Sequence, residues 1–125
     1  MPIDASLPYD EGNILARVLR GELPSKTVLE TEHSLAIHDI NPLAPIHVLV
    51  IPKGAYVSWD DFSARASEAE IVDFVRAVGE VGRRTGASAQ GYRLLANIGK
   101  RGRQEIAHLH VHLFGGAPLG PMLAR

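Results

Sequence analysis

Residues 105–116 read Glu105-Ile106-Ala107-His108-Leu109-His110-Val111-His112-Leu113-Phe114-Gly115-Gly116. Three of the chain's six histidines lie in this stretch, where they alternate with apolar residues. Alternation with a period of two predicts a β-strand with one apolar face in the core and one face of imidazole. Successive histidines on that face would lie about 6.5–7 Å apart, so one small anionic group can contact two of them.

The pattern leaves three interpretations of this histidine run. One histidine on a strand is usually a hydrogen-bonded structural residue, but three in register are costly to bury and repel one another when protonated. A metal site is the second interpretation, because alternate histidines can present neutral nitrogens to one ion. The third is catalysis, since an imidazole with a pKa of about 6.5 acts as nucleophile, base or proton donor near neutral pH. We favour catalysis and predict no metal and no cofactor.

The length and composition of the chain predict one globular domain. Its 125 residues are close to the usual size of a single domain, so we expect residues 1–125 to form one. Hydrophobic residues make up 46% of the chain and charged residues 22%, which is typical of globular proteins. Thirteen basic and fourteen acidic residues give a net charge of −1. This balance gives no general attraction for nucleic acid or anionic membrane, and we predict neither as a partner.

The residue types narrow the chemistry and the compartment. The chain has no cysteine, so disulfides, thiolate catalysis and cysteine-based zinc sites are excluded. The first residues lack the basic start and apolar core of a secretion signal, and no apolar run approaches the about 20 residues of a membrane span. We therefore expect a cytoplasmic protein that uses histidine and oxygen chemistry.

Hydrophobic periodicity predicts short elements in the first half of the chain. Residues 1–11 have no periodicity and are interpreted as a loose lead-in. Asn13 is expected to cap a short helix with apolar residues at helical spacing. The runs 27–30 and 34–39 predict a hairpin with a three-residue turn, and the apolar run 47–53 predicts a central strand.

The second half of the chain contains the clearest helix. Residues 54–66 have no clear period and are interpreted as a loop with a short helical turn. Ser67 and Glu70 then form a capping box that predicts the start of a long helix. The run 92–97 predicts a further strand, and 117–125 an irregular tail. The apolar stripe expected on the long helix consists of Ile71, Val75, Val78 and Val81.

Several polar residues are candidates to act beside the histidine run. Loop 98–104 leads directly into it, and the glycines of this loop can expose backbone N–H groups. The side-chain amides of Asn97 and Gln104 can donate to an oxyanion. Asp39 ends a strand just before an irregular loop, where functional sites usually form. His47 opens the central strand and is either a core residue or a support for the three histidines.

Four further stretches of the sequence carry a family resemblance together with the histidine run. They are Arg20-Gly21-Glu22-Leu23-Pro24, residues 39–53 with Asn41-Pro42 and Ile51-Pro52-Lys53, Gly91-Tyr92-Arg93, and Pro118-Leu119-Gly120-Pro121-Met122-Leu123. With His108-Leu109-His110-Val111-His112, they resemble the histidine triad (HIT) superfamily over nearly the whole chain. The resemblance is to its histidine triad nucleotide-binding branch, in the bacterial form.

The resemblance implies an α+β fold and a nucleotide hydrolase. The fold would have a mainly antiparallel sheet of about five strands and two helices, and would form a homodimer. The activity would be cleavage of the P–N bond of purine nucleoside 5′-monophosphoramidates through a nucleotidyl-histidine intermediate. By resemblance, His110 is the nucleophile and His112 donates to phosphate oxygen or the departing group, while His108 and His47 form the supporting network.

The same resemblance implies the nucleotide-binding residues. Asp39 would accept hydrogen bonds from the ribose hydroxyls. Glu105 stands where many members carry serine, and Arg103 replaces a usual glycine, so the rate and the preferred leaving group are expected to differ. The phosphate would be met by Asn97, Gly99, Gln104 and Glu105, and the purine base by Leu15, Val18, Leu23, Ile37 and Ile40.

Two other functions remain open at this point. Another branch with the same histidine run hydrolyses or phosphorolyses dinucleoside polyphosphates. The third possibility is a nucleotide-binding or scaffold protein whose hydrolysis is vestigial, which Glu105 and Arg103 mildly favour.

Overall fold

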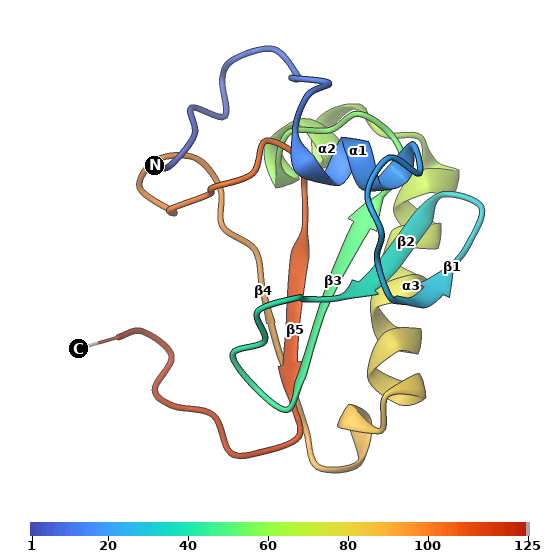
Figure 1. The fold of residues 1–125 in the computed structure, drawn as a ribbon, viewed down its shortest axis with the longest axis vertical. Helices are drawn as coiled ribbons and strands as arrows, with labels where there is room; N and C mark the ends of the chain where they lie inside the picture. Colours follow the sequence, from blue (N-terminus) through green and yellow to red (C-terminus); the bar gives the residue numbers. More distant parts are fainter. Residues whose placement is uncertain (125) are drawn as a thin grey trace.

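The computed structural model describes residues 1–124, and Arg125, the last residue of the predicted tail, lies outside the described residues. Five strands form one sheet in the order β1-β2-β3-β5-β4, and every neighbouring pair is antiparallel (Figure 1). This confirms the predicted α+β fold. The elements are α1 Ile14–Leu19, β1 Thr27–Glu30, β2 Ser34–His38, β3 Ile46–Pro52, α2 Trp59–Arg65, α3 Glu68–Arg84, the 3-10 turn η1 Ala87–Ala89, β4 Arg93–Leu95 and β5 Val111–Gly115.

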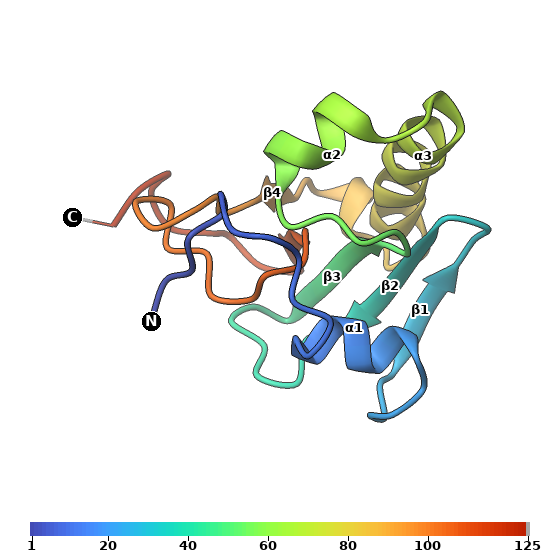
Figure 2. The same ribbon diagram turned by 90° about the horizontal axis from the view of Figure 1, so that it is seen from above.

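Helices cover both faces of the sheet. Figure 2 shows α2 and α3 on one side of the strands and α1 on the other. Each side has its own apolar core, because alternate residues of a strand point to opposite faces. The α3 side contains Ala36, Val48, Val50, Phe74, Val78, Val81, Val111 and Leu113, and the α1 side contains Leu15, Leu35, Ile37, Leu49 and Ile51.

Local capping signals set the helix starts as predicted. The Asn13 side chain accepts the backbone N–H of Ala16 at 2.9 Å and begins α1. Ser67 and Glu70 form the expected capping box at the start of α3. The predicted apolar stripe is wrong at one position, because Val75 is 59% exposed.

Helix α2 replaces a segment that was predicted as mainly loop. Ser58 and Asp61 form a capping box at its start, and Phe62 is its buried residue. The Phe62 ring packs 5.1 Å from those of Tyr56 and Phe74. One buried residue in seven gives no visible period, which is why periodicity did not detect the helix.

The histidine run contains less strand than predicted. Strand β5 begins at Val111, so His112 is the one histidine of the run inside it. Before β5, the backbone pairs elsewhere: Leu109 N–H donates to the carbonyl of Tyr56 at 2.8 Å. The ring of His108 donates to the carbonyl of Pro52, the last residue of β3, at 2.8 Å. Side-chain and loop hydrogen bonds therefore replace the β-ladder over residues 108–110.

The two ends of the described chain have no helix or strand but are tied to the sheet region. Ile3 N–H donates to the carbonyl of Gln104 at 2.7 Å, so the predicted loose lead-in contacts the loop before the histidines. The guanidinium of Arg93 donates to the carbonyls of Gly120 and Pro121 at 2.8 and 3.4 Å. Among residues 1–124, the helices are too short or too polar to cross a membrane.

Candidate active site

A cavity of about 830 Å³ lies between α1, β2 and the segment that precedes β5. It brings together ten of the fourteen residues that the sequence marked as site residues. The four that do not line it are His47, Gly99, Gln104 and His108. The ten lining residues are Leu15, Val18, Leu23, Ile37, Asp39, Ile40, Asn97, Glu105, His110 and His112.

One part of the cavity is an apolar pocket. Helix α1 contributes Leu15 and Val18 from its inner face, and Leu15 is 3% exposed. Ile37 enters from β2, and Leu23 follows the turn that ends α1. A pocket with this apolar lining suits an aromatic ligand.

The backbone fixes the protonation of His110. Its Nδ1 lies 2.7 Å from the carbonyl oxygen of His108, and because a carbonyl can only accept, Nδ1 must carry the proton. Nε2 is then an unprotonated nitrogen on a residue that lines the cavity. Burial lowers the pKa of His110, and the hydrogen bond to His108 opposes this shift in part. A neutral His110 with a free lone pair results.

The opposite tautomer is fixed at His112, with its proton on Nε2. Leu43 N–H donates to Nδ1 of His47 at 3.1 Å, so the proton of a neutral His47 is on Nε2. That Nε2 lies 2.9 Å from Nδ1 of His112 and donates to it. The remaining nitrogen of His112, Nε2, therefore carries a proton. Burial, followed by the nearby His110 and His47, lowers the pKa of His112 to about 4.

Asp39 links this histidine pair to the cavity. Its Oδ2 lies 3.4 Å from Nε2 of His47, and its Oδ1 accepts the backbone N–H of Asn41 at 2.8 Å. Asp39 also lines the cavity beside the apolar pocket. The carboxylate can accept hydrogen bonds from a ligand there while it attracts the His47 N–H.

Asp39, His47 and His112 also form a group that could hold a metal ion. Each offers one ligand atom, and these atoms lie within 4.8 Å of one another. A metal held between Asp39, Nε2 of His47 and Nδ1 of His112 would need a lone pair from each of the two nitrogens. Those two atoms already share one proton in a hydrogen bond, and freeing Nε2 of His47 would cost its Nδ1 the Leu43 N–H. The two histidine nitrogens are therefore arranged to share a hydrogen bond rather than to bind a metal ion.

Gly99 and Gln104, two predicted phosphate ligands, do not line the cavity and are engaged in hydrogen bonds within the protein. Gln104 is 1% exposed, and its amide donates to the carbonyls of Val57 and Ile106 at 2.6 and 2.9 Å. Its Oε1 accepts the N–H of Gly99 at 3.0 Å. Both amide hydrogens and the Gly99 N–H are thus engaged within the protein. A phosphate contact from either residue would require exchange of these bonds.

The family comparison agrees with this geometry. The sequence model of the HIT domain matches residues 20–119. The chain belongs to the HIT family. An uncharacterised 13.2 kDa HIT-like protein of Azospirillum brasilense is 63% identical over 117 residues, which are 94% of this chain and 96% of the relative. The purine nucleoside phosphoramidase of Escherichia coli K12 is 38% identical over 114 residues, or 91% and 95% of the two chains.

Solved HIT structures share the fold. A HIT family hydrolase from Clostridium thermocellum superimposes with a TM-score of 0.79 at 36% identity, over 92% of this chain and 99% of the other. A histidine triad protein from Clostridium difficile gives a TM-score of 0.78 at 35% identity, over 88% and 95%. These likenesses support the recognition of the histidine triad branch from sequence.

Sequence reasoning missed some residues at this HIT site. His38 was assigned no role from the sequence, yet this exposed residue lines the cavity one residue before Asp39. Its position next to Asp39 at the end of β2 was the available signal. Tyr9 was placed in the loose lead-in, yet its hydroxyl lies 2.6 Å from Nδ1 of His108. No local sequence pattern predicts a contact between Tyr9 and His108, which are 99 positions apart.

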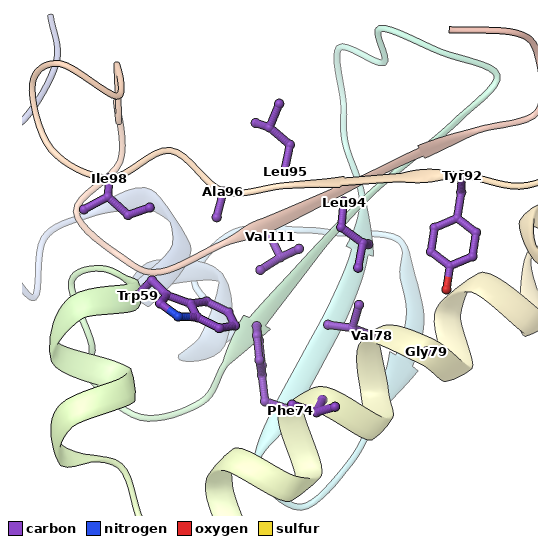
Figure 3. Close-up of a pocket in the computed structure, with 11 residues that line it drawn as sticks. Trp59, Phe74, Val78, Gly79, Tyr92, Leu94, Leu95, Ala96, Ile98 and Val111 are labelled. Atoms are coloured by element: carbon purple, nitrogen blue, oxygen red, sulfur yellow. The ribbon is translucent and has the colours of Figure 1, made fainter. Parts of the chain in front are cut away.

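A second cavity, of about 510 Å³, differs from the first because its lining is almost entirely apolar. It is lined by apolar and aromatic side chains of α2, α3 and β4, and Figure 3 shows Trp59, Phe74, Val78 and Leu94 around it. Trp59 is 42% and Leu94 48% exposed. Strand β4 is also an edge of the sheet. A surface of this kind is typical of a protein interface rather than of a reaction site.

Proposed function

We propose that this HIT protein is a hydrolase that cleaves the P–N bond of purine nucleoside 5′-monophosphoramidates and needs no cofactor. The observation that carries the proposal is that His110 and His112 are both neutral at one cavity but are held in opposite tautomers. One imidazole offers a lone pair and its neighbour offers an N–H, with ring centroids 5.1 Å apart. An apolar pocket in the same cavity suits a purine.

In the proposed complex, the substrate spans the cavity from base to phosphorus. The purine lies against Leu15, Val18 and Ile37, and the ribose hydroxyls donate to the carboxylate of Asp39. This leaves the phosphoryl group beside His110 and His112. Binding at the base end positions the phosphorus for the first step.

In the first step, Nε2 of His110 attacks phosphorus and the P–N bond breaks. The departing nitrogen takes the bonding electron pair and is protonated by solvent, while Nε2–H of His112 donates to a phosphoryl oxygen. The nucleotidyl-imidazolium keeps its Nδ1–H donated to the His108 carbonyl, which stabilises the positive charge. Water then attacks phosphorus and gives up a proton to solvent, the Nε2–P bond breaks with its electron pair returning to Nε2, and the nucleoside monophosphate leaves with neutral His110 regenerated.

Glu105 and Arg103 are proposed to act on the leaving-group side. Both line the cavity, and Arg103 has a backbone φ of 62°, which few residues other than glycine adopt. A carboxylate at Glu105 attracts an amine that departs with a positive charge. We therefore expect these two residues to tune which amine leaves fastest.

The test is steady-state hydrolysis of a fluorogenic adenosine phosphoramidate by the wild-type chain and by His110→Ala. We expect turnover in the wild type, unchanged by a chelator, and none in His110→Ala, which should still bind adenosine monophosphate. Faster cleavage of diadenosine polyphosphates would overturn the substrate class. Background turnover with tight monophosphate binding would instead favour a nucleotide-binding protein with vestigial hydrolysis.

We also propose that the chain forms a homodimer through the second cavity. Support comes from the exposed apolar side chains there and from the free edge of β4. Leu94→Glu should convert a dimer into a monomer by light scattering at equal concentration. A monomeric wild-type chain would contradict this part of the proposal. A cytoplasmic location and the absence of nucleic-acid and membrane partners are kept as predictions.

A further inference from the structure

Residues 3–9, here called the N-terminal strap, cross the loop that precedes the histidines. The first anchor is the hydrogen bond from Ile3 N–H to the carbonyl of Gln104, at 2.7 Å. The next residues form a turn, in which Asp4 Oδ1 accepts both the N–H and the hydroxyl of Ser6, at 3.0 and 2.6 Å. After the strap, Asp10 accepts the N–H of Gly12 and the chain enters α1. The strap is therefore held at both ends.

Tyr9, the last residue of the strap, contacts the first histidine of the run. Its hydroxyl lies 2.6 Å from Nδ1 of His108, and the two rings meet edge to face with centroids 5.6 Å apart. The other ring nitrogen of His108 donates to the carbonyl of Pro52. Nδ1 of a neutral His108 is then a lone pair, so the hydroxyl of Tyr9 must donate to it.

Both partners are in the protonation state that this bond requires. His108 is 0% exposed, and burial lowers its pKa to about 4, so the ring is neutral at neutral pH. Burial also raises the pKa of Tyr9, so its hydroxyl keeps its proton. Among the described residues, Tyr9 supplies the one side-chain partner of this Nδ1.

The contact reaches the proposed nucleophile through the backbone. The carbonyl of His108 is the acceptor for Nδ1–H of His110. We propose that Tyr9 is a positioning residue, which holds His108 in one tautomer and one ring orientation and thereby fixes the carbonyl that orients His110. The inference rests on the proposed function, because it assigns Tyr9 a part in that reaction.

The surroundings of Tyr9 favour this role over simple packing. Leu7 is 60% exposed, Pro8 is exposed, and Ile3 and Ala5 are only partly buried, so the strap adds no fully buried apolar side chain. Removing the hydroxyl would leave a buried ring nitrogen unpaired and free the ring to change tautomer. Asp39 and Leu15, which are proposed to bind the nucleotide, line the cavity, whereas Tyr9 and His108 do not, so we expect nucleotide binding to be unaffected.

The test compares Tyr9→Phe with Tyr56→Phe in the full chain. Tyr56 is a matched control, because its hydroxyl donates to Glu70 at 2.9 Å and takes no part in the histidine network. The readouts are the single-turnover rate of a purine phosphoramidate, the Kd for adenosine monophosphate, the Tm, and the ¹⁵N NMR signals of His108 and His110. The NMR signals report tautomers in the absence of any substrate.

For Tyr9→Phe we expect a single-turnover rate about tenfold lower, an unchanged Kd and a changed ¹⁵N signature of His108. Tyr56→Phe should leave all three at wild-type values. The inference is overturned if the His108 signals of Tyr9→Phe equal those of the wild type, or if its Tm and its affinity for adenosine monophosphate fall together with its rate, as in a general loss of structure. If the wild-type chain cleaves no phosphoramidate, the proposed function fails, and the NMR comparison still decides the role of Tyr9 in holding His108.

Discussion

The Nδ1–H of His110 is donated to the carbonyl oxygen of His108, two residues earlier in the chain, across 2.7 Å. This hydrogen bond orients the His110 ring through a backbone carbonyl of the same segment. It requires the segment to leave the β-ladder before Val111, which is where β5 begins. The orientation of His110, the proposed nucleophile, therefore depends on local backbone geometry and on the contacts that hold His108.

The activity should fall only at acidic pH. Burial lowers the pKa of His110 below its ordinary 6.5, and a protonated Nε2 cannot attack phosphorus. We therefore expect kcat/KM to be level from about pH 7 to 8 and to fall with a midpoint below 6.5. A pH series with a fluorogenic phosphoramidate measures this. An acid midpoint above 6.5 would contradict a buried, neutral nucleophile.

His47 should act through His112. His47→Leu removes the N–H donated to Nδ1 of His112, so His112 can hold its proton on the wrong nitrogen. We expect kcat to fall roughly tenfold or more, with the Kd for adenosine monophosphate changed much less. His47→Gln retains an N–H donor and should lose less activity. Equal losses in the two variants would show that the hydrogen bond to His112 is not the reason.

Asp39 should bind the ribose hydroxyls of the nucleotide. Its carboxylate lines the cavity and has an oxygen available beyond the Asn41 N–H. Wild-type affinity should drop about tenfold when the 2′- and 3′-hydroxyls are removed from the nucleotide, because hydrogen bonds to a charged group are strong. Asp39→Asn should bind both nucleotides with similar, weaker affinity, as calorimetry can measure. An undiminished preference for the ribonucleotide in Asp39→Asn would contradict the assignment.

His108 should make the stability of the fold depend on pH. Its pKa is lowered from 6.5 to about 4 in the folded chain, so only the unfolded chain binds the proton between these values. The free energy of unfolding should be level above about pH 7 and fall as the pH drops from 6.5 toward 4, by at most on the order of 3 kcal/mol from this residue.

Urea denaturation of the wild type, His108→Asn and His33→Asn from about pH 7 to pH 4 separates the contribution of His108 from that of other titrating groups. His108→Asn should be less stable at neutral pH and show a shallower acid loss. His33→Asn, at a partly exposed turn residue, should follow the wild type. The same acid loss in His108→Asn as in the wild type would contradict the prediction.

Local signals predicted most of the fold, because they depend on neighbouring residues. The cap at Asn13, the capping box of Ser67 and Glu70, and the hairpin of β1 and β2 were all identified this way. Helix α2 was missed because it buries only Phe62. The start of β5 was placed too early, since alternation does not reveal that Pro52 and Tyr56 take the bonds of the preceding segment.

The sequence predicted which residues line the candidate site better than it predicted how they are arranged. The resemblance to the HIT family gave residues that now line one cavity, from Leu15 to His112. It did not give the tautomers, which depend on backbone groups such as Leu43 N–H. Nor did it give Tyr9, whose contact with His108 joins distant parts of the chain. Such contacts follow from tertiary packing and leave no periodic pattern.

The most direct test of the account is to trap the covalent intermediate. The wild-type chain is mixed with an equimolar purine phosphoramidate, quenched within milliseconds, and examined by peptide mass spectrometry and ³¹P NMR. The account predicts a nucleotidyl group on Nε2 of His110, formed at least as fast as the steady-state turnover and absent in His110→Ala. A nucleotidyl group on His112, or turnover with no covalent intermediate at any quench time, would contradict it.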